Sequence, residues 1–140
     1  MKRKSYLAAL VLLAVPAMAR AEPVQVRLQW IGNDATGGVL VSRVRGLLAT
    51  SPDKRETFAD KDGLSVIVQT LDPAIEWQDG IAAQGRLTVY SLTINQHYAE
   101  TRNDTFAGAA LGYCALADLA SCAREIIEAM DEQIARRAIR

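Results

Sequence analysis

The first clear pattern of apolar and polar residues is a strict alternation from Val24 to Trp30 (VQVRLQW). A period of two places every second side chain on one face of a β-strand, so this stretch predicts a half-buried strand. After turn-forming residues 32–34 (GND), apolar residues recur at helical spacing between Leu40 and Leu48. The pattern therefore predicts a helix that ends near Thr50.

Three further strands are predicted. Residues Leu64–Leu71 (LSVIVQTL) are rich in β-branched side chains and are bounded by turn-forming residues. In Arg86–Asn95 (RLTVYSLTIN) the apolar phase changes between Val89 and Tyr90, which a bulge or burial on both faces explains. Thr105–Cys114 (TFAGAALGYC) is predicted as the last strand, although its many alanines also suit a helix.

The C-terminal segment has the clearest helical pattern. Its apolar residues recur every three or four positions and define one face, while charged residues occupy the rest. That face consists of Leu119, Ala123, Ile126, Ile127, Met130 and Ile134. The segment is therefore predicted as a second amphipathic helix.

The predicted order of elements is β-α-β-β-β-α, which indicates an α+β fold. In such a two-layer sandwich, two helices pack on one face of a small, mostly antiparallel sheet. The strands at 24–30 and 64–71 are joined through a helix, so we expect them to be parallel, with a right-handed crossover. The polar stretch 51–63 and the irregular stretch 72–85 are predicted as loops.

Residues 1–21 have the three regions of a secretory signal peptide: a positive start at 2–4 (KRK), an apolar run at Leu7–Val15, and the small-x-small motif at 19–21 (ARA). The apolar run is shorter than the roughly 20 residues that span a membrane. We therefore expect cleavage before Glu22 and no transmembrane segment afterwards. The product is predicted to be one globular domain, residues 22–140, in the periplasm or secreted.

Cleavage would change the charge balance. Lys2, Arg3, Lys4 and Arg20 would be removed, so that 12 of the 16 basic and all 16 acidic residues remain, a net charge of −4. The remaining basic residues are scattered and form no stripe that would neutralise a row of phosphates. Nucleic acid is therefore not an expected partner.

Cys114 and Cys122 are the only cysteines. If one helix ran unbroken through both, its rise would separate them by about 12 Å, beyond the roughly 7 Å limit for a disulfide. If Cys114 ends a strand and Cys122 lies in the first turns of the helix, the two can meet, and an oxidising compartment favours their bond. We predict the disulfide; the alternative is two buried free thiols.

No catalytic residue, metal site or cofactor is predicted. His97 is the only histidine, so neither a metal centre built on several imidazoles nor a Ser-His-Asp or Cys-His relay with a spare base can be assembled, and its polar surroundings predict a surface position. Residues 60–63 (DKDG) resemble the opening of a calcium loop but lack its other ligands. The turn at 32–38 (GNDATGG) offers N–H groups to an anion, although an ordinary strand-to-helix turn is favoured.

One loop carries the candidate binding residues Asp72, Glu76, Trp77 and Asp79. Acids beside an aromatic side chain suit a carbohydrate site, and tryptophan is favoured at the centres of protein interfaces. Trp77 is therefore either folded over the core or exposed for binding. Trp30, at a strand end, is expected in the core.

Two functional hypotheses follow. The favoured one is a non-enzymatic envelope protein that binds another envelope or periplasmic protein through a sheet edge or the 72–85 loop. The alternative is a small periplasmic hydrolase or ligand-binding protein that uses the acidic loop around Trp77. The absence of an assembled nucleophile, base or metal motif favours the first.

Overall fold

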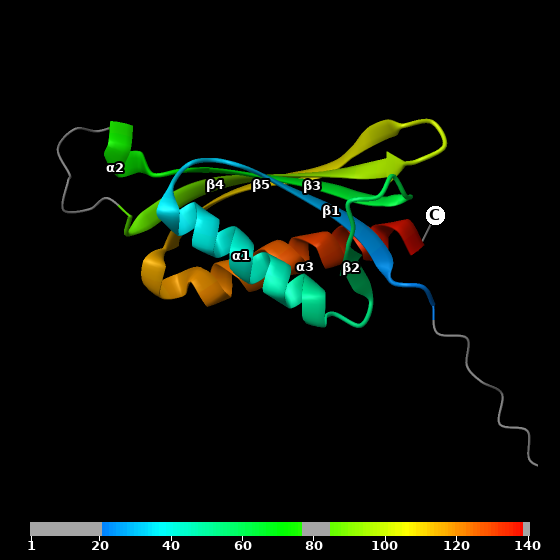
Figure 1. Ribbon diagram of the computed structural model, residues 1–140, viewed down its shortest axis with the longest axis horizontal. Coiled ribbons are helices and arrows are strands. Elements are labelled where there is room, and N and C mark those ends of the chain that lie inside the picture. The colour runs from blue at the N-terminus through cyan, green and yellow to red at the C-terminus, as the bar shows by residue number, and fades with distance from the viewer. Residues whose placement is uncertain (1–20, 77–84, 139–140) are drawn as a thin grey trace, which may run out of the picture.

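A computed structural model describes residues 21–76 and 85–138. These residues form a two-layer α+β fold, which confirms the predicted class (Figure 1). The elements in chain order are β1 (Val24–Ile31), α1 (Ala35–Thr50), β2 (Lys54–Glu56), β3 (Gly63–Leu71), α2 (Pro73–Glu76), β4 (Leu87–Tyr98), β5 (Asn103–Ala115), η2 (Leu116–Asp118) and α3 (Leu119–Ala138).

The sheet is mixed, with the strand order β2-β1-β3-β4-β5. β1 and β3, which are joined through α1, are parallel, as predicted, and they are direct neighbours; β3, β4 and β5 follow as an antiparallel meander. The additional short strand β2, within the stretch predicted as a loop, pairs in parallel with β1. The antiparallel half of the sheet thus agrees with the prediction, and β2 extends its parallel half.

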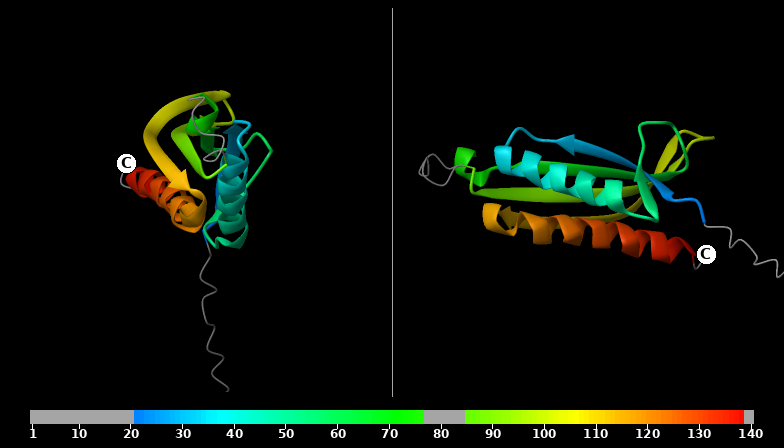
Figure 2. Two further views of the ribbon diagram at one scale, coloured as in Figure 1. Left: turned by 90° about the vertical axis from the view of Figure 1, so that its left-hand side faces the viewer. Right: turned by 60° about the horizontal axis from the view of Figure 1, so that its bottom comes forward.

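Both long helices lie side by side on one face of the sheet, which we call the inner face (Figure 2). Alternate residues of each central strand face these helices, as Val66 and Val68 do on β3 and Leu92 and Ile94 on β4. The helices contribute Leu40, Val44, Leu48, Leu119, Ala123, Ile126 and Met130 to the same buried core. Neither α1 nor α3 covers the opposite face, which we call the outer face.

A buried polar chain fixes the start of α1. Asp34 caps the helix by accepting a hydrogen bond from the Gly37 N–H (2.7 Å), and it also accepts one from the Thr70 hydroxyl (2.5 Å). Trp30 Nε1 donates to the same hydroxyl at 2.8 Å, so the half-buried indole packs against the core with its N–H paired. A Cβ on Gly37 would lie 2.3 Å from Thr70 Oγ1, so this close contact requires glycine. Helix capping by Asp34 and close packing at Gly37 therefore account for the residues of the 32–38 turn.

The short edge strand β2 is tied to α3 by a buried lysine. Lys54 is 5% exposed, and its Nζ lies 2.5 Å from Asp131 Oδ1 on α3 and 3.1 Å from Asp53 Oδ1. Although burial alone would lower it, these hydrogen bonds leave the pKa of Lys54 above its ordinary value. The ion pair thus anchors a strand that has only three residues.

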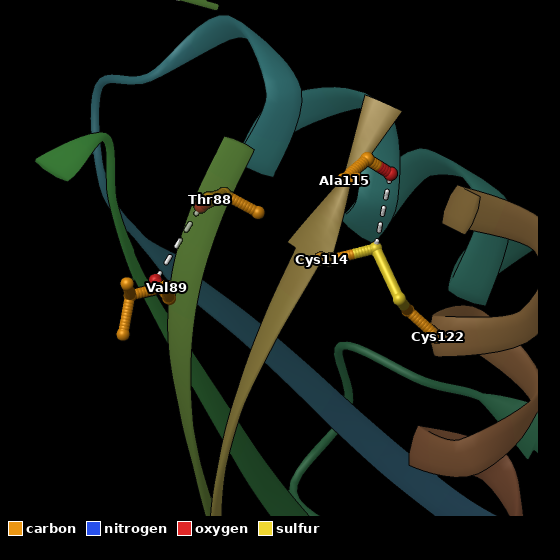
Figure 3. The surroundings of a disulfide bond; sticks show 5 residues. All are labelled: Thr88, Val89, Cys114, Ala115 and Cys122. Carbon is orange, nitrogen blue, oxygen red and sulfur yellow. Dashed lines mark hydrogen bonds between the residues drawn. A yellow bond between two sulfur atoms is a disulfide. The ribbon is translucent and has the colours of Figure 1, made fainter. Parts of the chain in front are cut away.

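The predicted disulfide between Cys114 and Cys122 is present, with 6.1 Å between the two Cα atoms. Cys114 lies near the end of β5 and Cys122 in the first turn of α3, and the short helix η2 turns the chain between them. Figure 3 shows the bond joining the end of the strand to the neighbouring helix. It fixes the inner side of β5 to the start of α3.

None of the helices among residues 21–76 and 85–138 combines the length and the apolar character that a membrane crossing needs. The predicted signal peptide, apart from Ala21, lies outside the described residues.

Candidate interaction surface

The outer face of the sheet carries large apolar side chains on its last strands. Leu111 and Tyr113 of β5 are 82% and 77% exposed, and Phe106 of the same strand is 67% exposed. Val89 of β4 pairs with Tyr113 and is also exposed. A cluster of this kind on one face marks a candidate interaction surface.

Strand β5 also ends the sheet, so one of its long sides is uncovered. The Leu116 N–H donates to the Arg86 carbonyl at 2.8 Å, which continues the β4–β5 ladder. Because hydrogen-bonded and non-bonded pairs alternate in an antiparallel ladder, the even-numbered residues from Gly108 to Cys114 direct their N–H and C=O groups toward β4. The backbone groups of Ala109, Leu111 and Tyr113 therefore point away from the sheet. We call this side of residues 108–113 the β5 edge.

The β5 edge lacks the features that usually prevent strand-to-strand association. Residues 105–117 contain no charged residue and no proline. One irregularity in the β4–β5 ladder lies between Ile94 and Asn95, next to Ala107, and the ladder is regular from Gly108 onward. The edge is thus a regular, uncharged strand with large apolar side chains on its outer face.

The inner side of β5 carries only small residues before Cys114. A Cβ on Gly112 would lie 2.5 Å from the Tyr90 hydroxyl oxygen, so the Tyr90 ring packs directly against this glycine. Ala110 also belongs to the inner side, yet it is exposed, so α3 does not cover this part of the strand. The large apolar side chains of β5 therefore lie on the outer face, where a sheet with one buried face usually carries polar residues.

The predicted binding loop is described only in part. Asp72 is 3% exposed, and its carboxylate accepts hydrogen bonds from the N–H groups of Ala74 (2.9 Å) and Gly85 (2.7 Å). The Gly85 carbonyl in turn accepts a 2.6 Å hydrogen bond from Thr36 on α1. Asp72 therefore fixes the two ends of the loop to each other.

The other candidate binding residues of this loop lie at or beyond its described part. Glu76 is the last residue of α2, and Trp77 and Asp79 lie outside the described residues. Of the four candidates, Asp72 is therefore the one whose side chain the structure describes.

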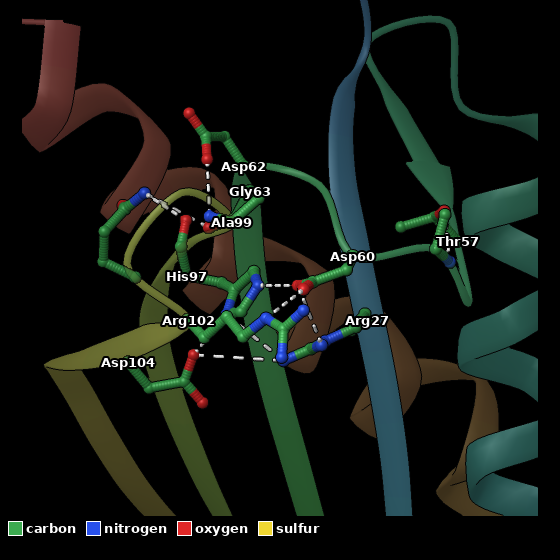
Figure 4. A network of polar contacts seen from close by, with 11 residues as sticks. Arg27, Thr57, Asp60, Asp62, Gly63, His97, Ala99, Arg102 and Asp104 are labelled. Carbon is green, nitrogen blue, oxygen red and sulfur yellow. Dashed lines mark hydrogen bonds and ion pairs between the residues drawn. The ribbon is translucent and has the colours of Figure 1, made fainter.

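His97 lies at the end of β4 under the 57–62 loop, and it is 4% exposed, so the predicted surface position is wrong. Its Nδ1 contacts Asp104 Oδ1 at 2.6 Å, and its Nε2 contacts Asp60 Oδ1 at 2.5 Å (Figure 4). The Arg27 guanidinium lies 3.7 Å from Asp60 Oδ1 and 4.0 Å from Asp104 Oδ1. The loop that carries Asp60 covers the ring, which explains its burial.

The charges in this network favour a protonated imidazole. The hydrogen bond to Asp104, together with that to Asp60, raises the pKa of His97 against the opposing effects of burial and of Arg27. The same contact with His97 lowers the pKa of the Asp60 carboxyl. In the protonated form both ring N–H groups donate to these carboxylates, so the imidazolium has no lone pair left to act as a base or a metal ligand.

The acids of the calcium-like stretch serve the same local structure. Asp60 holds His97, and Asp62 accepts a 2.7 Å hydrogen bond from the Ala99 N–H in the β4–β5 turn. Within the described part of the chain, no group of three or more His, Cys, Asp or Glu residues could hold a metal ion. The 57–62 loop is thus fixed to the β4–β5 hairpin by its carboxylates.

The sequence pattern predicts strand β5 but did not lead us to expect its exposed apolar surface. The available signal was the distribution of side-chain size, since Leu111 and Tyr113 alternate with Gly108, Ala110 and Gly112. A period of two with small residues on the core side indicates a strand whose large side chains serve another surface.

Comparison of the chain with protein-family models, curated proteins and solved structures gives no match.

Proposed function

We propose that this chain is an exported protein of the cell envelope that acts by binding a protein partner, either a different protein or a second copy of itself, along the β5 edge, without turning over a substrate. The observation that carries the proposal is an uncharged edge strand with two large apolar side chains, Leu111 and Tyr113, that are largely exposed. Such a strand is prone to aggregate when it is left uncovered, so a functional occupant of the edge is expected.

The geometry of the β5 edge suits the addition of a strand from a partner. The outward N–H and C=O groups of Ala109, Leu111 and Tyr113 would supply the main-chain hydrogen bonds, and alternate side chains would supply selectivity. Tyr113 and Phe106 provide the large, stiff apolar contacts that dominate the energy of many interfaces. The partner therefore needs an extended segment with apolar side chains on one face.

The polar groups of the described residues support binding over catalysis. Both ring nitrogens of His97 are hydrogen-bonded, one to Asp60 and the other to Asp104. A hydrolase that used the 72–85 loop would need free acids, whereas the carboxylate of Asp72 accepts hydrogen bonds from its own loop. No contact within the described part of this loop favours the hydrolase alternative.

Two features support export. The N-terminal residues 1–21 have the sequence of a signal peptide. The disulfide between Cys114 and Cys122 belongs to a class of bond that persists in oxidising compartments such as the periplasm. We therefore assign the protein to the periplasm as part of the proposal.

Photo-crosslinking in the native host tests this function. A photoreactive phenylalanine at position 111 replaces a side chain that is 82% exposed on the β5 edge. We expect discrete crosslinked adducts in the cell envelope, because a bound partner strand would lie within a few ångströms of this position.

The matched control carries the same photoreactive residue in place of Ile31, which is 46% exposed on the outer face of β1, away from β5. Adducts from position 111 that are absent from position 31 support the proposal. Equal adducts from both positions, or none from position 111, would refute it.

A further inference from the structure

The residues along the β5 edge allow it to pair symmetrically with an identical edge, which a surface for binding a protein does not require. We propose, on the basis of the function proposed above, that its occupant is the β5 edge of a second copy of this chain. The two strands pair antiparallel about a two-fold axis at Leu111 and join two sheets into one.

The backbone directions allow this pairing. An antiparallel pair centred on Leu111 places Leu111 opposite Leu111 of the second copy and Ala109 opposite Tyr113 of the second copy. All three are residues whose N–H and C=O groups point away from β4. Each of these pairs exchanges two main-chain hydrogen bonds, as a hydrogen-bonded antiparallel pair does.

The side chains on the outer face are complementary in size in this register. The large Tyr113 ring faces the small Ala109 on both sides of the axis, and the two Leu111 side chains meet at its centre. Leu111 of one copy and Tyr113 of the other are then diagonal neighbours, close enough for an aromatic ring to contact an aliphatic chain. Both of these side chains are largely exposed in the single chain and would lose that exposure together.

Next to the axis, the inner side of the strand presents only small residues to a second copy. Ala110 faces Gly112 of the second copy there, so no large side chain meets another at the junction. Ala110 is exposed although it belongs to the inner side, which shows that α3 leaves the space beside it open. A two-fold axis perpendicular to the sheet puts the helices of both copies on the same face of the joined sheet.

Charge also favours a second copy as the occupant. A symmetric contact places each residue near its own equivalent or a close neighbour, so any charge near the axis would meet a like charge. Residues 105–117 contain no charge, and the edge therefore pairs with itself without repulsion. A partner selected by opposite charge would instead require a charged edge.

Sedimentation of the protein tests the pairing. The chain is expressed from its full sequence, recovered from the envelope fraction and studied over a dilution series. We expect a concentration-dependent dimer. In Leu111→Lys, two ammonium groups face each other at the axis, and the concentration at which dimers form should rise by at least about 10-fold.

Ile31→Lys is the matched control, because it introduces the same charge at an exposed apolar position of the outer face, away from β5. It should dimerise as the wild type does. Both variants should keep the wild-type circular dichroism spectrum, since both replaced side chains are exposed, and all three proteins should share one thermal midpoint at concentrations where they are monomeric. Tyr113→Ala removes the contact with Ala109 without adding charge, and it should also weaken the dimer.

Two results would overturn the self-pairing: a wild-type protein that stays monomeric up to millimolar concentration, or a dimer that both Leu111→Lys and Tyr113→Ala leave unchanged. A monomer that still crosslinks from position 111 to a different protein overturns the self-pairing and leaves the proposed function standing. A monomer without any such adduct overturns both.

Discussion

Both ring nitrogens of His97 are hydrogen-bonded to carboxylates, so the charge of this one side chain controls how firmly the 57–62 loop is held to the hairpin of β4 and β5. Asp60 reaches the ring from the loop, and Asp104 reaches it from β5. Loss of the imidazolium charge leaves two carboxylates and Arg27 around a neutral ring. The network is therefore a source of pH-dependent stability.

Stability should fall as the pH rises from 6 to 9. The pKa of His97 is raised above its ordinary value of about 6.5, so its contribution is complete below that value and is lost as the pH rises through the folded-state pKa. The pKa of Asp60 is lowered, so its contribution is lost only as the pH falls below about 4. Urea unfolding at a series of pH values measures both limbs.

His97→Gln should remove the decline between pH 6 and 9, since glutamine carries no charge over this range. Arg102→Ala is a control within the same network, because this side chain is 86% exposed and its Nε lies 3.8 Å from Asp60. It should keep the wild-type pH dependence. Parallel pH profiles for the wild type and His97→Gln would show that this histidine does not control the stability.

Asp72→Ala should lower the free energy of unfolding by about 1–3 kcal/mol, because it leaves two loop N–H groups without their buried acceptor. Glu100→Ala, at an exposed position in the β4–β5 turn, should change it by less than about 0.5 kcal/mol. Urea unfolding compares the two variants. An unchanged stability in Asp72→Ala would contradict the role of Asp72 in fixing the loop.

At the scale of elements, the disulfide determines how β5 and α3 are joined. The bond closes a short loop with a sequence separation of 8 residues. In the chain-entropy model, a loop of this size stabilises the fold by about 2–3 kcal/mol. The double variant Cys114→Ala, Cys122→Ala should lose that amount in equilibrium unfolding.

Peptide mapping without reductant provides the direct test of the bond, and the peptides that contain Cys114 and Cys122 should be linked to each other. Alkylation of both thiols without reductant in denatured protein would contradict the geometry of the strand-to-helix turn.

The elements that the sequence predicted are those whose pattern is local. The alternation in β1, the β-branched run in β3 and the apolar face of α3 each follow from residues within the element itself. Strand β2 is different, because its sequence KRE has no strand pattern. It is a strand because α1 returns the chain beside β1 and because Lys54 bonds Asp131, and neither contact is local.

The disulfide, the burial of His97 and the exposure of the β5 edge were predictable to different degrees, because only the first depends on residues close together in the sequence. The disulfide followed from spacing and helix geometry, whereas the burial of His97 depends on a loop 37 residues away in the sequence. That β5 ends the sheet depends on the order of strands, which no local pattern determines. The uncharged β5 edge was therefore visible as a strand but not as a surface.

At the scale of the whole molecule, export predicts the residue at which the mature chain begins. Protein recovered from the periplasm should begin at Glu22, because Ala19 and Ala21 satisfy the small-residue requirement of signal peptidase. Intact-mass measurement checks this, and the total cell lysate provides the unprocessed reference. A periplasmic protein that retains residues 1–21 would contradict the assignment.

Amide hydrogen exchange along β5 tests most directly whether the chain works by binding a protein at this edge. The protein is isolated under mild conditions together with its binding partner. Half of the sample is then stripped of the partner and diluted. In the stripped chain, the amides of Ala109, Leu111 and Tyr113 should exchange fast while those of Ala110 and Gly112 exchange slowly. In the recovered assembly, the three fast amides should become slow. Equally fast exchange in both samples would contradict the account.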